Sequence, residues 1–245
     1  MQMSLAQLFT ILLAALGPAS KPDQPQFQLK SGDQIVAIGD SITQAGGYLR
    51  NTDAVLAQQY PDLKLPKIIN VGISGQKAED LVKRFENDVI ARKPAVVTLS
   101  IGINDVWHRL KEPHDSQVLA RYKENVSKMV DQAQAANIRV ILLTPTIIQE
   151  DPAAEGNQRL KLYIDAQKEI AAQKKCQLVN LHQMFLDVLA KKPKELTPSA
   201  KGLILTTDGV HKNGAGNALM SLGLLRALGV PDKKITIQGN PQPTK

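Results

Sequence analysis

Five short runs of consecutive apolar residues, separated by stretches with helical periodicity, constrain the fold of this 245-residue chain more than any other feature. The runs are rich in β-branched residues and do not alternate with polar ones, which is typical of parallel strands buried on both faces. Strands that alternate with helices in this way predict a single doubly wound α/β domain with right-handed crossovers. The runs lie at 34–39, 67–71, 95–100, 139–143 and 177–180.

The stretches between these runs are predicted to be helices. Apolar side chains recur with a period of about 3.6 residues through 116–136, as expected of a helix with one buried face. Apolar residues make up 43% of the chain and charged residues 22%, which supports a packed core and excludes global disorder. The expected helices span 48–60, 77–91, 116–136, 158–174, 181–190 and 213–228.

The N-terminal segment differs from the rest, because residues 1–20 carry no charged side chain. Leu8–Leu16 is an apolar run of signal-peptide length, and we predict a signal peptide over 1–20, cut near Ala19 or Ser20. The alternative is an amphipathic N-terminal helix, since no Lys or Arg precedes the run. We predict a secreted or periplasmic protein with a linker or N-terminal extension at 21–33, the α/β domain at 34–230 and a tail at 231–245.

Several classes of function are disfavoured. The chain has one cysteine, Cys176, which excludes an intrachain disulfide and a cysteine-based zinc site. No apolar run reaches the ~18–20 residues of a membrane span. The net charge is +7, but the basic pairs are dispersed and lack the aromatic residues that stack on bases. We therefore expect no metal or cofactor, no nucleic-acid partner and no stable membrane insertion; the oligomeric state stays open.

Small and polar residues follow the predicted strands at the points where a ligand crevice forms in such sheets, outside the carboxyl ends of the strands. Ser41 follows the first strand in the segment Gly39-Asp40-Ser41-Ile42-Thr43. A serine there is a candidate nucleophile, which needs a neighbouring base. It is equally well explained as the N-cap of the next helix.

His211 is the candidate base. It is the only one of the four histidines with a carboxylate three residues before it in a glycine-containing loop, Asp208-Gly209-Val210-His211. At that spacing Asp208 can accept from the imidazole and fix its tautomer. A surface loop that happens to carry both residues is the alternative.

An acyl-transfer site also needs donors for the developing oxyanion. Gly72 offers a backbone N–H after the second strand, and Asn104 offers a side-chain amide after the third. The alternatives are a glycine required by a turn and an asparagine that caps a loop.

Taken together, these segments resemble the signature blocks of the SGNH (GDSL-type) hydrolases. The four blocks occur in the family's order, and the resemblance extends from about residue 34 to 228. It departs from the family only at Ile42, where the name-giving motif has leucine. The blocks are Gly39–Thr43, Asn70-Val71-Gly72-Ile73-Ser74-Gly75, Gly102-Ile103-Asn104-Asp105 and Asp208–His211.

The resemblance implies a three-layer, flavodoxin-like α/β/α sandwich with a mostly parallel five-stranded sheet. It implies Ser41 as nucleophile, His211 as general base and acid, and Asp208 as the residue that orients His211. The oxyanion hole would comprise the N–H groups of Ser41 and Gly72 and the side chain of Asn104.

The resemblance thus implies a serine ester hydrolase that acts on short acyl esters, with O-acetyl groups on carbohydrate as the preferred substrate. Trp107 and His108 follow Asn104 closely and are candidate substrate-binding residues, although Trp107 is equally well explained as a core residue under the loop. Two alternatives share the fold: a non-catalytic carbohydrate-binding module, and an acyltransferase or thioesterase.

Overall fold

The computed structural model describes residues 3–17 and 27–235. Its centre is a parallel five-stranded sheet in the order β2-β1-β3-β4-β5. The strands confirm the five predicted runs to within two residues at each end. They are β1 Ile35–Gly39, β2 Ile69–Asn70, β3 Val96–Ser100, β4 Arg139–Leu143 and β5 Gln177–Val179.

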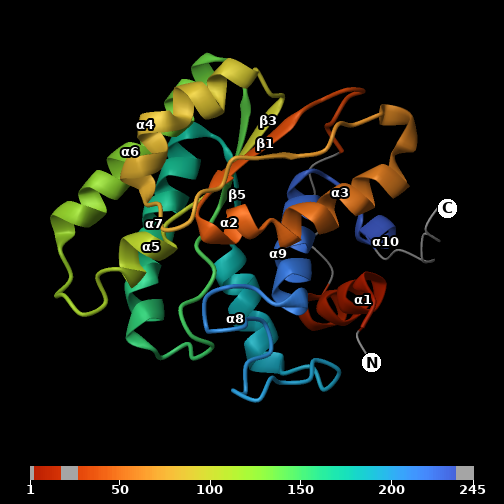
Figure 1. The fold of residues 1–245 in the computed structure, drawn as a ribbon, viewed down its shortest axis with the longest axis vertical. Helices are drawn as coiled ribbons and strands as arrows, with labels where there is room; N and C mark the ends of the chain where they lie inside the picture. The colour runs from red at the N-terminus through yellow and green to blue at the C-terminus, as the bar shows by residue number, and fades with distance from the viewer. Residues whose placement is uncertain (1–2, 18–26, 236–245) are drawn as a thin grey trace.

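Helices cover both faces of the sheet and make three layers (Figure 1). One layer holds α4 (Ala78–Asp88), α6 (Ser116–Ala135) and α7 (Glu155–Lys174), with α6 between the other two. The other holds α3 (Gly47–Gln59), α8 (Leu181–Lys191) and α9 (Gly214–Ala227). Every residue of β1 and β3 is buried between these layers, which is why both strands read as unbroken apolar runs.

Two five-residue helices were not predicted: α2 (Ser41–Ala45) directly after β1 and α5 (Ile103–Trp107) after β3. Such short helices have too few turns for an apolar period, so the sequence pattern does not reveal them. Both begin at the carboxyl ends of neighbouring strands, because Gly39 of β1 lies opposite Ser100 of β3. The chain runs from β1 to β2 on one side and then crosses to β3 on the other, so these helices flank the switch point of the sheet.

The N-terminal segment forms helix α1 (Leu5–Leu16), which packs on α8 and α9. Its Phe9 and Leu12 are completely buried. Lys191 of α8 donates to the carbonyl of Ala15. Residues 5–16 are thus a packed helix of the structure. Cleavage near residues 19–20 lies outside the described residues, and the signal peptide stays a prediction.

The chain's last described segment also packs. We predicted a tail from residue 231, and its first part forms α10 (Asp232–Ile235), with Ile235 fully buried. Arg226 of α9 bonds to Asp232 through both carboxylate oxygens at 2.9 Å. Ion pairing therefore fixes the start of the predicted tail against α9.

Candidate active site

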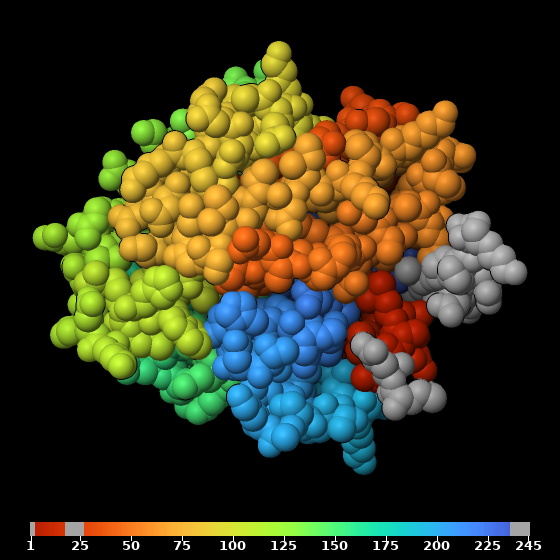
Figure 2. Space-filling model, in the orientation of Figure 1, coloured from red at the N-terminus to blue at the C-terminus, as the bar shows by residue number. Residues whose placement is uncertain are grey.

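Three predicted residues form a continuous hydrogen-bonded chain across two distant segments. The Oγ of Ser41 lies 3.0 Å from Nε2 of His211, and Nδ1 of His211 lies 2.7 Å from Oδ2 of Asp208. Figure 2 shows the orange segment around residue 40 against the blue segment around residue 210, with no other part of the chain between them on this face. The fold therefore brings together a serine and a histidine that are 170 positions apart in sequence.

Asp208 determines which nitrogen of His211 carries the proton in this row of hydrogen bonds. Partial burial raises the pKa of Asp208, but hydrogen bonds from the His211 ring and from the N–H groups of His211 and Val210 outweigh it and lower the pKa to about 2. Asp208 is therefore an acceptor at neutral pH, and the imidazole proton resides on Nδ1. That tautomer leaves Nε2 free to accept from the Ser41 hydroxyl.

Ser41 is the first residue of α2, not its cap. Asp40 is the N-cap, and its Oδ1 accepts from the N–H of Ile42 at 2.9 Å. The N-cap interpretation of Ser41 is therefore wrong. The hydroxyl of Ser41 is left for His211, at the positive end of a short helix.

Gly72 lies against the nucleophile-bearing helix. A Cβ on Gly72 would sit 2.3 Å from the N of Gln44, so only glycine fits there. Its N–H, the predicted oxyanion donor, donates to Oδ1 of Asn70 at 2.9 Å. The Asn70 amide in turn donates to the carbonyl of Thr43 at 2.7 Å. Asn70 therefore joins α2 to the 72–76 loop and occupies the Gly72 donor.

A second glycine of the same loop presents a different donor. Gly75 has φ +76°, a conformation that favours glycine, and no hydrogen bond of its N–H is found within the described residues. Asn104, the other predicted donor, uses its amide to bond the carbonyl of Gln76 at 3.1 Å. The loop segment that starts at Gly75 is therefore adjacent to the Asn104 side chain.

Two buried carboxyls support the strand ends. Burial raises the pKa of Asp40 to about 6, against the Ile42 hydrogen bond and the positive charges of Lys212 and His211. Burial likewise raises the pKa of Asp105 to about 7, and its oxygens lie 3.3 and 3.4 Å from the N of Ala78, the first residue of α4. Both accept backbone N–H bonds.

The candidate substrate-binding residues lie on the surface. Trp107, the last residue of α5, is 39% exposed, so it does not fill the core beneath the loop. His108 follows it and is exposed as well. Ile73, next to Gly72, is 42% exposed. An apolar surface is therefore present on the two loops that carry the candidate donors.

No functional role was predicted for Glu150, Asn70 or Lys212, although Asn70 lies in one of the blocks that carry the family resemblance. Glu150 accepts from the N–H groups of Ile204 and Leu205 and from the hydroxyl of Thr206, residues at least 54 positions away. Only folding brings such partners together, so no local spacing could have revealed Glu150. Lys212 directly follows His211, and that adjacency was the one available signal.

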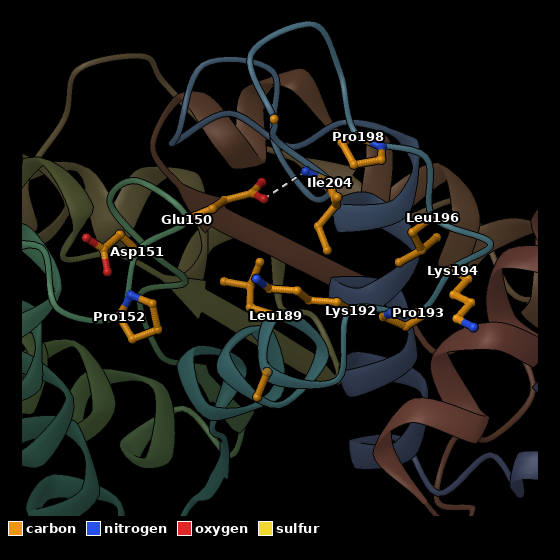
Figure 3. Close-up of a pocket in the computed structure, with 12 residues that line it drawn as sticks. Glu150, Asp151, Pro152, Leu189, Lys192, Pro193, Lys194, Leu196, Pro198 and Ile204 are labelled. Atoms are coloured by element: carbon orange, nitrogen blue, oxygen red, sulfur yellow. Dashed lines mark hydrogen bonds between the residues drawn. The ribbon is translucent and has the colours of Figure 1, made fainter.

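A large cavity lies apart from the Ser41–His211 pair. It has a volume of about 660 Å³ and lies between the end of α8 and the chain segments around residues 150 and 200 (Figure 3). Neither Ser41, Asn104 nor His211 lines it, and Glu150 forms part of its wall. The reacting groups thus lie outside this cavity.

Residues 3–17 and 27–235 contain neither a metal-binding cluster nor a membrane-spanning helix. Within them, no three His, Cys, Asp or Glu side chains are grouped so that they could hold a metal ion. Within the same ranges, no helix has the length and hydrophobicity to span a bilayer.

The model of the GDSL-like lipase/acylhydrolase family matches residues 37–219. This chain belongs to that family. It has the SGNH hydrolase fold and is a carboxylic ester hydrolase. The match covers the strand-end loops and the 206–212 loop, the segments that carry the hydrogen-bonded chain.

Individual relatives agree with this assignment. An acetylxylan esterase from Geobacillus stearothermophilus is 32% identical over 222 residues, covering 82% of this chain and 96% of the relative. Its crystal structure matches with a TM-score of 0.71, at 31% identity over 82% of this chain and 95% of that one. Three further structures are catalytic mutants of it that replace a serine, an aspartate and a histidine, the last two three positions apart.

Two other similar proteins broaden the comparison. LAE5, an α/β hydrolase from the metagenome of Lake Arreo, has a TM-score of 0.72 at 28% identity, covering 82% of this chain and 97% of its own. The uncharacterized lipoprotein YqeF of Bacillus subtilis is 31% identical over 146 residues, 57% of each chain.

Proposed function

We propose that this enzyme removes small acyl groups, above all O-acetyl groups from carbohydrate, through an acyl-enzyme on Ser41. The observation that carries the proposal is the Ser41–His211–Asp208 hydrogen-bonded chain. The acetylxylan esterase relative supports the substrate class, and its catalytic mutants replace the same three residue types.

The geometry supports a two-step reaction. His211 Nε2 takes the Ser41 proton as Oγ attacks the ester carbon, and the imidazolium then protonates the departing sugar oxygen. Water deprotonated by His211 next attacks the acyl-enzyme, and Ser41 recovers its proton as the carboxylic acid leaves. Asp208, ionised and hydrogen-bonded to Nδ1, stabilises the imidazolium in both steps.

The oxyanion would be bound by the N–H of Ser41, the side chain of Asn104 and one N–H of the 72–76 loop. Gly72 serves only if the Asn70 side chain releases its N–H, because the two are hydrogen-bonded. The Gly75 N–H needs no such release and lies on the segment that Asn104 contacts. We therefore favour Gly75 over Gly72 as the third donor.

The openness of the site supports a polymeric or carbohydrate substrate with a small acyl group. The side chains of His211 and Asp208 are about half exposed, at 48% and 47%, so a bulky leaving group can approach them. Trp107 and His108 would contact the sugar, the tryptophan by stacking on a ring face. For such a polymer, a secreted or envelope location fits, and the lipoprotein relative supports it.

The test compares hydrolysis of p-nitrophenyl acetate, butyrate and octanoate by the wild type and by Ser41→Ala. We expect turnover to fall as the acyl chain lengthens and to vanish in the variant, with an unchanged melting temperature. Substantial turnover by folded Ser41→Ala would refute the nucleophile. A folded wild type without activity on any ester would favour the carbohydrate-binding module, and acetyl transfer to an added sugar would favour the acyltransferase.

A further inference from the structure

Lys212 directly follows His211, yet the two side chains have different partners. His211 faces Ser41 on the surface, whereas the Lys212 side chain is partly buried and its ammonium lies over a ring of α8. There it donates to the carbonyl of Val210 and lies 5.1 Å from the ring centroid of Phe185, a fully buried residue of α8. A lysine side chain normally keeps its ammonium in water, so this burial requires a compensating interaction.

The compensation comes from carboxylates on three different segments. Asp40 at the start of α2, Asp208 on the same loop and Glu150 after β4 all act on the Lys212 charge. None of them forms a contact ion pair with it among the described residues. The ammonium therefore acts as a shared counter-charge and not as one half of a salt bridge.

We propose that Lys212 is a positioning residue of the active site. Its ammonium ties the loop that carries Asp208 and His211 to α8, through the Val210 carbonyl on one side and the Phe185 ring on the other, and its charge acts on the carboxylate of Asp40 at the start of α2. Asp40 caps that helix through Ile42, next to Ser41. The charge of Lys212 thus acts both on the loop that carries His211 and on the helix start that carries Ser41. This proposal rests on the proposed esterase function.

The charges around the pair set the expected pH dependence. Burial lowers the pKa of Lys212 to about 7, against the three carboxylates. Asp40 faces Lys212 and His211, which lower its pKa, and it also faces Asp105 and the phenol of Tyr48. Loss of the Lys212 charge therefore raises the pKa of Asp40, so that the Asp40 carboxyl becomes ionised only at higher pH.

The experiment measures kcat and KM for p-nitrophenyl acetate against pH in the wild type, Lys212→Met and Lys212→Gln. Methionine fills the space without charge, and glutamine keeps a donor for the Val210 carbonyl without charge. Lys201→Met, which removes an exposed lysine of the preceding segment, is the matched control. Melting temperatures accompany every measurement.

Below pH 7, where Lys212 is charged, we expect both Lys212 variants to lose roughly 10- to 100-fold in kcat, the cost of a small misplacement of reacting groups, with little change in KM. The acid limb of their pH profiles moves to higher pH, and Lys201→Met overlays the wild type. The melting temperature of Lys212→Met stays equal or rises, because replacing a buried charge by an apolar side chain is often neutral or stabilising. If either variant kept the wild-type pH dependence of kcat, the proposal would be overturned. If only Lys212→Gln kept it, the loss of kcat in Lys212→Met would be due to the hydrogen bond to Val210 and not to the charge.

An inactive wild type would count against the proposed function, and Lys212 is then tested by stability alone. Because the pKa of Lys212 is lowered from 10.5 to about 7, the unfolded chain binds the extra proton between these values. The free energy of unfolding should therefore rise with pH across that window in the wild type and less in Lys212→Met. Equal slopes would show a solvated ammonium and overturn the proposal.

Discussion

The two halves of the active site are held by different kinds of structure. Ser41 and Asn104 follow β1 and β3, whose residues pair in register up to Gly39 and Ser100. Asp208 and His211 lie instead on the 206–212 loop, where the only strand-like contact found in the described chain is an isolated bridge between Thr206 and Lys212. The sheet thus fixes the nucleophile half, whereas the base half depends on other interactions.

The base half is held by side chains that bond to backbone groups. The N–H groups of Val210 and His211 both donate to Oδ1 of Asp208, at 2.9 and 2.7 Å. Thr206 accepts from the N–H of Gly209 and donates to Glu150. These side-chain hydrogen bonds hold the loop in place of backbone pairing between strands. A change to one side chain should therefore loosen the loop, whereas a comparable change beside β1 or β3 should leave the sheet in place.

The largest of the effects that test this comparison is expected at Asn104, in the sheet half. Asn104→Ala removes an amide donor from the proposed oxyanion hole, and we expect kcat to fall by about 10²–10³ with KM nearly unchanged. The fold should persist, because β3 and α5 keep their places without that side chain. An unchanged kcat would remove Asn104 from the hole, and a collapse of the melting temperature would show that its bond to the Gln76 carbonyl is mainly structural.

The same division explains what could be predicted from the sequence. The strand runs and the residues directly after them were predictable, because buried parallel strands and the crevice at their carboxyl ends leave a local pattern. The pairing of Ser41 with His211 came from the family resemblance, since no spacing encodes a contact across 170 positions.

Other features depend on three-dimensional packing and left no local signal. Asn70 occupies the Gly72 N–H because α2, itself not predicted, approaches that loop closely. The sequence predicts a signal peptide where helix α1 lies, because an apolar run without charge has the same pattern whether it is a signal or packs on α8 and α9. Glu150 was missed because its three donors lie far along the chain.

A smaller effect is expected at Glu150, which tests the base half. Glu150→Gln replaces one acceptor oxygen by an amide that faces two backbone N–H groups, so the bonds to Ile204 and Leu205 cannot both survive. We expect kcat to fall by roughly 10-fold, since the looser loop misplaces His211. The matched control is Glu195→Gln, an exposed carboxyl of the preceding segment, which should behave as wild type. If Glu150→Gln lowers the melting temperature but leaves kcat intact, Asp208 alone holds the loop.

The smallest effect on activity, and a clear one on stability, is expected at Asp105. Burial raises the pKa of Asp105 to about 7, so between 3.8 and that value the folded chain binds a proton that the unfolded chain has lost. This group therefore makes the free energy of unfolding fall as pH rises through that window, by on the order of a few kcal/mol.

Asp105→Asn should remove that fall, because asparagine does not titrate and its carbonyl can still accept from Ala78. Urea unfolding at the two ends of the window, with activity measured alongside, checks this. The contrast is Asp208, whose pKa is lowered to about 2, so its contribution is retained above 3.8 and lost as pH falls toward the lower value. Asp208→Asn should therefore keep the fall that Asp105→Asn removes. An equal slope in Asp105→Asn and wild type would mean that Asp105 is not the group through which neutral pH lowers the stability of this fold.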